Sequence, residues 1–362
     1  MVPLVKVGLP EKNILLPAIE EVLYSGVIAE GEYVYKFEEK FKDVFNLEGT
    51  VLGMSSGTAA LHTALLLCGL KPGDEVITTS MTAEPTNLSI LYTGAKAIFA
   101  DVISSSGNIS PSSIEEKITK KTKAILVVHY AGYPVKLDEI KKIAEKHHIP
   151  LIEDCAHALG AIYDKKSIGN TGDFSIFSFQ AIKHLTTIDG GVLHIKNSSL
   201  SDEAKKIRWF GMQKGIERTK VNITSLGYKY NMNNVTAAIG LVQLAEIKDR
   251  INKHILNGQF FDNVVEKIQG LSHATFDQNS TPSYWLYTLL SDDWEDIQKK
   301  LNEIGVQSSK LHRPNNYHTI FDSNKNALPN LNIFYNRLLH LPCGWWVTEE
   351  TREQIANTLI KG

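Results

Sequence analysis

The sequence lacks several features that would assign it to a particular class of protein. It has only 3 cysteines in 362 residues, and Cys68, Cys155 and Cys343 lie far apart without the spacing of metal ligands. We therefore expect a reduced, cytoplasmic protein with no disulfide framework and no metal site. No apolar stretch approaches the roughly 18 residues that a membrane helix needs, and the first residues lack the pattern of a signal peptide. A membrane partner is not expected.

A surplus of charge of either sign is also missing. Lys and Arg total 38 against 40 for Asp and Glu, which gives a net charge of −2. A nucleic-acid partner is not expected, because its binding needs a basic surplus or stripe. The 43% of apolar residues is enough for a packed interior, and a chain of this length exceeds one ordinary core. A metabolic enzyme with a large and a small domain fits these limits.

Short apolar runs rich in β-formers alternate with helical patterns in the first two thirds of the chain. The predicted strands are 75–79, 97–101, 124–129, 150–154, 174–177 and 191–195, and the predicted helices are 59–68, 84–92, 111–118 and 137–147. This alternation is typical of βαβ units and predicts an α/β fold with a mainly parallel sheet flanked by helices. Ligands of such sheets bind beyond the carboxyl ends of the strands.

The pattern changes near residue 222. A polar, aromatic loop over 227–234 precedes a helix predicted at 235–247, followed by a strand at 284–290 and helices at 294–304 and 348–360. We predict a large domain over residues 1–244 and a small C-terminal α+β domain over 245–362.

Three segments carry candidate chemistry. Ser56-Gly57-Thr58 opens a helix, where free amides can bind an anion. Asp154 ends an apolar strand, where a buried carboxylate needs a cation or a strong donor. Lys183 follows an aromatic strand, and partial desolvation would favour its neutral, nucleophilic amine. Each segment alone has a commoner explanation, namely a helix cap, a loop carboxylate and a solvated lysine.

Together the three segments indicate one cofactor. An anion cradle, a strand-end carboxylate and an amine follow one another along a single parallel α/β domain. Pyridoxal 5′-phosphate (PLP) needs an anion site, a partner for its pyridinium nitrogen and an amine that captures its aldehyde.

The sequence resembles the DegT-type nucleotide-sugar aminotransferases, which are fold-type I PLP-dependent enzymes. The resemblance spans nearly the whole chain. Its motifs are Leu23–Gly31, Ser56–Leu61, Gly73–Ile77, His129–Pro134, Glu153–Gly160, Phe177–Phe179 with Lys183, Gly190–Gly191, Ala237–Gly240 and, more loosely, Ile304–Val306 and His340–Pro342.

The resemblance also implies roles for individual residues. Lys183 would bind the cofactor covalently and transfer protons, and Asp154 would pair with the pyridinium nitrogen. Ala156 would lie against the ring, and His157 would bond the phenolic oxygen. The phosphate would be held by Ser56, Gly57, Thr58, Ser178 and, from a neighbouring subunit of a homodimer, Lys229.

Two positions depart from the pattern of the family. Ala83 stands where many relatives carry an aromatic residue that stacks on the pyridine ring, so either Met81 or another side chain covers that face, or the face is more open. Lys229 stands where the family has the Asn that reaches the partner's phosphate, and Asn231 stands where it often has Arg. Lys is a workable charge for a phosphate.

The resemblance implies that an amino group passes from glutamate through pyridoxamine 5′-phosphate to a nucleotide-linked keto sugar, with 2-oxoglutarate as the second product. C4 of a 4-keto-6-deoxyhexose is the expected acceptor. An aminotransferase for 3-keto sugars, a PLP-dependent sugar dehydratase and a non-catalytic sugar-responsive regulator remain alternatives. Candidate substrate contacts are Tyr33, Trp285, His312 and Arg313.

Overall fold

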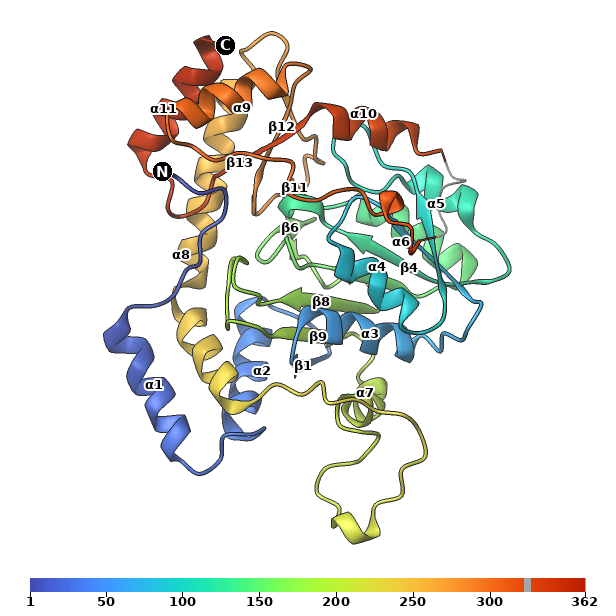
Figure 1. Ribbon diagram of the computed structural model, residues 1–362. Helices are drawn as coiled ribbons and strands as arrows, with labels where there is room; N and C mark the ends of the chain where they lie inside the picture. The colour runs from blue at the N-terminus through green and yellow to red at the C-terminus, as the bar shows by residue number, and fades with distance from the viewer. Residues whose placement is uncertain (322–326, 362) are drawn as a thin grey trace.

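A seven-stranded sheet forms the centre of the computed structural model, which describes residues 1–321 and 327–361 (Figure 1). Its order is β1-β9-β8-β5-β4-β2-β3. The strands are β1 (Thr50–Met54), β2 (Glu75–Thr79), β3 (Lys96–Ala100), β4 (Thr122–Val128), β5 (Leu151–Asp154), β8 (Phe174–Ser178) and β9 (Gly191–Ile195). Neighbours from β8 to β3 run parallel, whereas β9 is antiparallel to both β8 and β1. The predicted mainly parallel sheet is confirmed.

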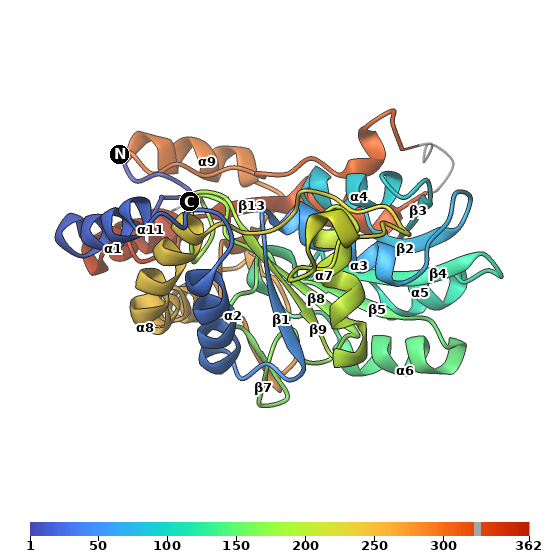
Figure 2. The same cartoon turned by 90° about the horizontal axis from the view of Figure 1, so that it is seen from below.

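Helices cover both faces of this sheet (Figure 2). One face packs on α2 (Glu32–Val44), α5 (Pro111–Lys117), α6 (Leu137–His147) and α8 (Asn234–Val265), and the other on α3 (Gly57–Leu67), α4 (Glu84–Leu91) and α7 (Ser201–Arg208). Strand β4 shows why its sequence is apolar throughout. Ile125 and Val127 belong to the first apolar cluster, and Leu126 and Val128 to the second. A strand buried on both faces cannot alternate apolar with polar residues.

Helix α8 extends well beyond its prediction. It is capped by Asn233, whose side chain accepts from the amide of Thr236 at 2.9 Å, and it runs for 32 residues from Asn234. The prediction ended at residue 247, before a polar stretch, but Ile251, Phe261 and Val265 continue the buried stripe. The predicted domain boundary at 244/245 therefore falls inside a continuous helix, which joins the sheet to the C-terminal elements (Figure 1). The division into two domains stays a prediction.

The C-terminal elements form a smaller α+β unit around a third apolar cluster. Its sheet has the order β10-β12-β13, with β10 (Ser272–His273), β12 (Tyr287–Leu290) and β13 (Leu338–Leu341). Its helices are α9 (Trp294–Glu303), α10 (Pro329–Arg337) and α11 (Glu349–Lys361). The amide of Thr351 donates to the Thr348 hydroxyl at 3.2 Å, which confirms the predicted cap of the last helix.

Several elements were not predicted: α2, α7, α10, β1, β10 and β13 among those above, and the following helix and small sheet. Helix α1 (Lys12–Tyr24) packs with α2 against α8. A small sheet of order β11-β6-β7 joins β11 (Ser280–Thr281), β6 (Ile162–Tyr163) and β7 (Lys166–Ser167). Within the described residues, no helix is both long and apolar enough to cross a membrane.

Candidate functional site

A cavity of about 330 Å³ opens at the carboxyl ends of β1, β5 and β8. The strand ends and the loop after β8 bring together residues that are more than 120 positions apart in the chain. The predicted site residues that line it are Ser56, Gly57, Thr58, Asp154, Ala156, His157, Ser178, Lys183 and His312.

The start of helix α3 forms one end of the cavity. The Ser56 hydroxyl accepts from the Ala59 amide at 3.0 Å, so this side chain caps the helix, while Gly57 and Thr58, its first two residues, line the cavity. Gly57 is required by close packing, because a Cβ there would lie 2.9 Å from the Cβ of Ser178. Free amides and the positive end of the helix dipole make this end suitable for a phosphate.

Asp154 lies on the floor of the cavity and is buried. One carboxylate oxygen accepts from the Ala156 amide at 3.0 Å, and the other from the Thr86 hydroxyl at 2.8 Å. Because Thr86 donates its proton to Asp154, Thr82 is the donor in the 3.0 Å contact between the two threonine hydroxyls. Burial raises the pKa of Asp154, although these two donors and Lys183 oppose the shift. A cation bound beside this carboxylate would hold it ionised.

Lys183 is presented by a tight turn after β8. Its amide donates to the Gln180 carbonyl at 3.0 Å, and the amide of Phe179 closes the loop on the Gly190 carbonyl at 2.9 Å. Burial lowers the pKa of the Lys183 amine to about 7, against the opposing attraction of Asp154. An amine with this pKa is largely available as a nucleophile near neutral pH.

Two histidines add unpaired polar atoms to the cavity wall. His157 and His312 lie with their rings nearly parallel, at an angle of 6° and a centroid distance of 5.5 Å. Burial holds the pKa of His157 well below its usual value and lowers the pKa of His312 to about 4. Both rings are therefore neutral near pH 7. Nδ1 of His157 and Nε2 of His312 are buried and have no hydrogen-bond partner among the residues that the structure describes, as expected for atoms that face a polar ligand.

A buried amide pair fixes the loop that carries His312. Asn315 donates from Nδ2 to the Thr82 carbonyl at 2.9 Å and accepts at Oδ1 from Asn87 at 2.9 Å. This pair joins the His312 loop to the cavity wall after β2. Thr86, Asn87 and Asn315 were not predicted, since no local pattern distinguishes them from ordinary polar residues.

The wall beside Ala83 is apolar. Leu61, Pro85 and Ile176 line the cavity together with Ala83, whereas Met81 is fully buried in the third apolar cluster and does not line it. The suggestion that Met81 covers the ring face is therefore wrong.

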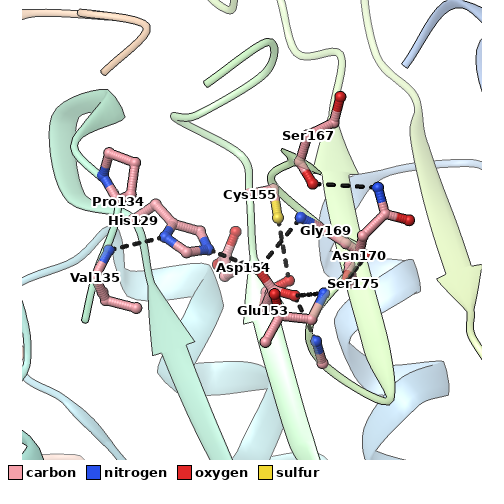
Figure 3. Close-up of polar contacts among 12 residues, drawn as sticks. His129, Pro134, Val135, Glu153, Asp154, Cys155, Ser167, Gly169, Asn170 and Ser175 are labelled. Atoms are coloured by element: carbon pink, nitrogen blue, oxygen red, sulfur yellow. Dashed lines mark hydrogen bonds and ion pairs between the residues drawn. The ribbon is translucent and has the colours of Figure 1, made fainter. Parts of the chain in front are cut away.

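Glu153, the neighbour of Asp154, points to a second buried polar cluster (Figure 3). Its carboxylate accepts from His129 Nε2 at 3.1 Å and from the amides of Gly169, Thr171 and Gly172 at 3.2, 3.0 and 2.6 Å. Burial alone would raise the pKa of Glu153, but these donors outweigh it and lower the pKa.

His129, Glu153 and Cys155 lie close enough to suggest a metal site, but their donor atoms are engaged. His129 Nδ1 accepts from the Val135 amide at 3.1 Å, so the proton is on Nε2 and points to Glu153 (Figure 3). Burial raises the pKa of the Cys155 thiol well above its usual value, which keeps it protonated. The cluster fastens the loop at 169–172 to β5.

Four predicted site residues lie outside the cavity. Tyr33 on α2 hydrogen-bonds the Glu21 carboxylate, and Arg313 is exposed with its guanidinium 5.3 Å from the centroid of the Tyr317 ring. The Lys229 amine lies 4.0 Å from the centroid of the Trp209 ring. Trp285 is buried behind Lys183.

The residues present fit PLP. The amides before and within the first turn of α3 suit its phosphate, Asp154 suits a protonated pyridine nitrogen, and Lys183 suits its aldehyde. The unpaired nitrogen of His157 suits an oxygen of the ring. Ala83 and Ala156 line the cavity with small side chains, which suits the approach of a ring.

Comparisons with known proteins agree with this fit. Residues 11–360 match the model of the DegT/DnrJ/EryC1/StrS aminotransferase family. The crystal structure of the sugar aminotransferase CalS13 from Micromonospora echinospora superposes with a TM-score of 0.95, at 31% identity and full coverage of both chains. GDP-perosamine synthase of Escherichia coli O157:H7 is 34% identical over 77% of this chain and 75% of its own. The spore coat polysaccharide biosynthesis protein SpsC of Bacillus subtilis is 32% identical over 90% and 88%.

The fold and the cavity define a fold-type I PLP-dependent aminotransferase. The chain belongs to the DegT/DnrJ/EryC1/StrS aminotransferase family. It is a sugar aminotransferase, and its cofactor is PLP.

Proposed function

We propose that this enzyme transfers the amino group of glutamate to C4 of a nucleotide-linked 4-keto-6-deoxyhexose, for the biosynthesis of a deoxyamino sugar in a polysaccharide. The observation that carries the reaction is the shared cavity of the Lys183 amine, the Asp154 carboxylate and the start of α3. The sugar class is supported by relatives whose names are GDP-perosamine synthase and a spore coat polysaccharide biosynthesis protein.

Bound PLP supplies an electron sink for the carbon that loses or gains the amino group. Asp154 stays ionised beside the pyridine nitrogen and keeps that nitrogen protonated. Lys183, with its lowered pKa, accepts and returns protons at the reacting carbon as general base and acid. The neutral rings of His157 and His312 offer hydrogen bonds to hydroxyl or phenolic oxygens without adding charge.

The dehydratase alternative requires a histidine in place of the lysine. Here Lys183 lines the cavity, and the neighbouring His184 instead bonds the Ser283 carbonyl at 3.1 Å. An aminotransferase for 3-keto sugars would keep the same cavity residues, and only the choice of substrate separates it.

The test is a half-reaction followed by the visible absorbance of the bound cofactor. Purified enzyme loaded with PLP is mixed with glutamate and should lose its yellow colour as 2-oxoglutarate forms. A panel of 4-keto and 3-keto sugars linked to GDP, dTDP or UDP is then added, and a 4-keto-6-deoxyhexose should restore the colour fastest. Restoration by a 3-keto sugar alone moves the proposal to C3. A colour unchanged by every amino donor favours the regulator or the dehydratase.

We also propose that the active unit is a homodimer that works in the cytoplasm. The loop at 210–228 projects from the body of the molecule (Figure 1) and exposes apolar side chains, with Leu226 83% exposed. Tyr24, at the end of α1, is 84% exposed. Lys229 follows the projecting loop and does not line the cavity of its own chain, which suits a contact with the phosphate bound by a partner. The three unpaired cysteines suit a reducing compartment.

The dimer is tested by light scattering and by cofactor binding. Wild type should have twice the chain mass, and Leu226→Asp should reduce it toward the monomer. Lys229→Ala should weaken PLP binding by about tenfold through loss of one charged contact, and Lys229→Arg should retain most of it. A monomer that binds PLP with wild-type affinity contradicts the shared site.

A further inference from the structure

Both neighbours of Lys183 are tied to one segment of the smaller α+β unit. The indole N–H of Trp285 donates to the Ile182 carbonyl at 2.9 Å. In the opposite sense, His184 Nε2 donates to the Ser283 carbonyl at 3.1 Å. The two hydrogen bonds bracket Lys183, so the backbone on each side of the amine depends on the position of residues 283–285.

The ring of Trp285 also lies against the amine itself. Nζ of Lys183 is 4.0 Å from the centroid of the indole ring. The same ring stacks on His157 at 4.1 Å with an angle of 18°. Trp285 is only 2% exposed and does not line the cavity, so it offers no surface to a sugar.

The segment that carries Trp285 is itself held firmly. Tyr284 adopts a left-handed backbone conformation, with a φ of 44°, which is unusual for a bulky residue. Its hydroxyl donates to the Asp262 carboxylate on α8 at 2.5 Å. Its ring packs over Gly258, where a Cβ would lie 2.3 Å away. The amide of Leu286 donates to the Ala131 carbonyl beyond β4 at 3.3 Å.

We propose that Trp285 is a positioning residue for Lys183. The indole N–H of Trp285 fixes the turn that carries Lys183, and its ring keeps water from the Lys183 amine. This inference rests on the role of Lys183 in the proposed function. It replaces the expectation that Trp285 contacts the substrate.

Two opposing effects of the ring decide what its removal does. The face of an aromatic ring attracts an ammonium group, which would raise the pKa of the lysine. Exclusion of water penalises the ammonium and lowers the pKa. Burial is the largest cause of the lowered pKa of Lys183, and the ring is part of what buries the amine. We therefore expect removal of the ring to raise the pKa.

The first test measures the Lys183 amine in the full-length protein without cofactor. Its labelling by an amine-reactive reagent is followed against pH and quantified on the Lys183 peptide by mass spectrometry. Trp285→Ala should raise the apparent pKa by about one pH unit or more. The matched control is Trp294→Ala, because the Trp294 ring lies 3.9 Å from the amine of Lys310 outside the cavity. It should leave Lys183 unchanged.

The second test separates the indole N–H from the ring. Trp285→Phe keeps an aromatic ring near the amine but removes the donor to the Ile182 carbonyl. We expect the pKa of Lys183 to stay close to wild type and kcat to fall about tenfold, with KM for glutamate and for the sugar little changed. On the other flank, His184→Gln should retain more of kcat than His184→Ala, because the amide can still donate to Ser283.

The outcomes distinguish this role from others. An unchanged Lys183 pKa and kcat in both Trp285 variants, with a higher KM for the sugar alone, would make Trp285 a substrate contact and overturn the proposal. If Trp285→Ala does not fold, an unchanged kcat in Trp285→Phe is enough to overturn the proposal. The labelling pKa needs no substrate, so a failure of the proposed transamination leaves the role of Trp285 separately measurable.

Discussion

Two adjacent carboxylates of β5 show the difference between the scaffold and the site. Glu153 and Asp154 are both buried, and they point to opposite sides of the strand. Glu153 accepts four hydrogen bonds from its own chain. Asp154 accepts two and lines the cavity. The pKa of Glu153 is lowered by its donors, whereas that of Asp154 is raised by burial.

This comparison shows how a functional carboxylate can be told from a structural one. Donors from the chain fully compensate the burial of Glu153, so nothing further is needed there. The burial of Asp154 is only partly compensated, which leaves its charge available to a bound cation. The carboxylate whose burial is only partly compensated, Asp154, is therefore the one that belongs to the active site.

The largest effect is expected from Lys183→Ala. It should reduce turnover in the glutamate half-reaction by more than about a thousandfold, because the nucleophile and the proton carrier are the same amine. Lys310→Ala is the matched control, since Lys310 also lies against a tryptophan ring. It should retain near wild-type turnover, and appreciable turnover by Lys183→Ala would remove Lys183 from its proposed role.

The next largest effect is expected from Asp154→Asn. The amide preserves the shape of the side chain but cannot hold the pyridine nitrogen protonated, so kcat should fall by about a hundredfold or more. Because an uncompensated charge is removed, the unfolding free energy of the cofactor-free protein should not decrease. Stopped-flow kinetics measure kcat and urea unfolding measures the unfolding free energy. A clear loss of stability with normal kcat would make Asp154 a structural carboxylate rather than a functional one.

Glu153→Gln should instead lose stability and keep its kcat. Its amide group would face backbone donors, so the unfolding free energy should fall by about 2–4 kcal/mol. The fraction that remains folded should keep its kcat. Glu145→Gln is the control, because Glu145 is exposed and pairs with Lys141 at 3.7 Å on the surface. Its effect should stay within about 0.5 kcal/mol.

A smaller, pH-dependent effect should come from Lys183. Its pKa falls from 10.5 to about 7 on folding, so the unfolded chain binds more protons between these values. The unfolding free energy of the cofactor-free protein should therefore rise from pH 7 to pH 9.5, by at most about 1.4 kcal/mol per pH unit. Lys183→Met should lack this component, and parallel pH profiles of the two proteins would show that the amine is not desolvated.

The smallest effect concerns Glu153 in acid. Its folded pKa lies below the ordinary value of 4.5, so its stabilising contribution is present above that pH and is lost as the pH falls through the folded value. The difference in unfolding free energy between wild type and Glu153→Gln should narrow below pH 4.5. If the difference in unfolding free energy between the two proteins stays constant down to pH 3, the donors around Glu153 do not stabilise its ionised carboxylate.

Local patterns predicted the central strands and most of the helices that flank them. The predicted strand 75–79 and helix 137–147 agree with β2 and α6 at both ends, because a turn at 71–74 precedes the strand and the apolar residues of the helix are strongly periodic. The prediction failed where such signals were weak. Helix α8 continued through a polar stretch, because its buried residues pack against elements that are distant in the chain.

The site was predicted in part for the same reason. Residues next to strand ends and helix starts, such as Asp154 and Thr58, are found by rule, and the cavity contains them. Thr86 and Asn315 were missed because their partners lie 68 and 228 positions away. Trp285 was recognised, but the direction of its indole depends on the left-handed turn at Tyr284.

The sequence by itself determined the α/β class, the chemistry of the reacting groups and the family, because these depend on periodicity and on residue types in a fixed order. Only the tertiary structure decided which of two neighbouring carboxylates meets the cavity, which side chains support it and what encloses the amine of Lys183. Those features depend on burial and on contacts between distant segments, which set the free energy of every charge in the site.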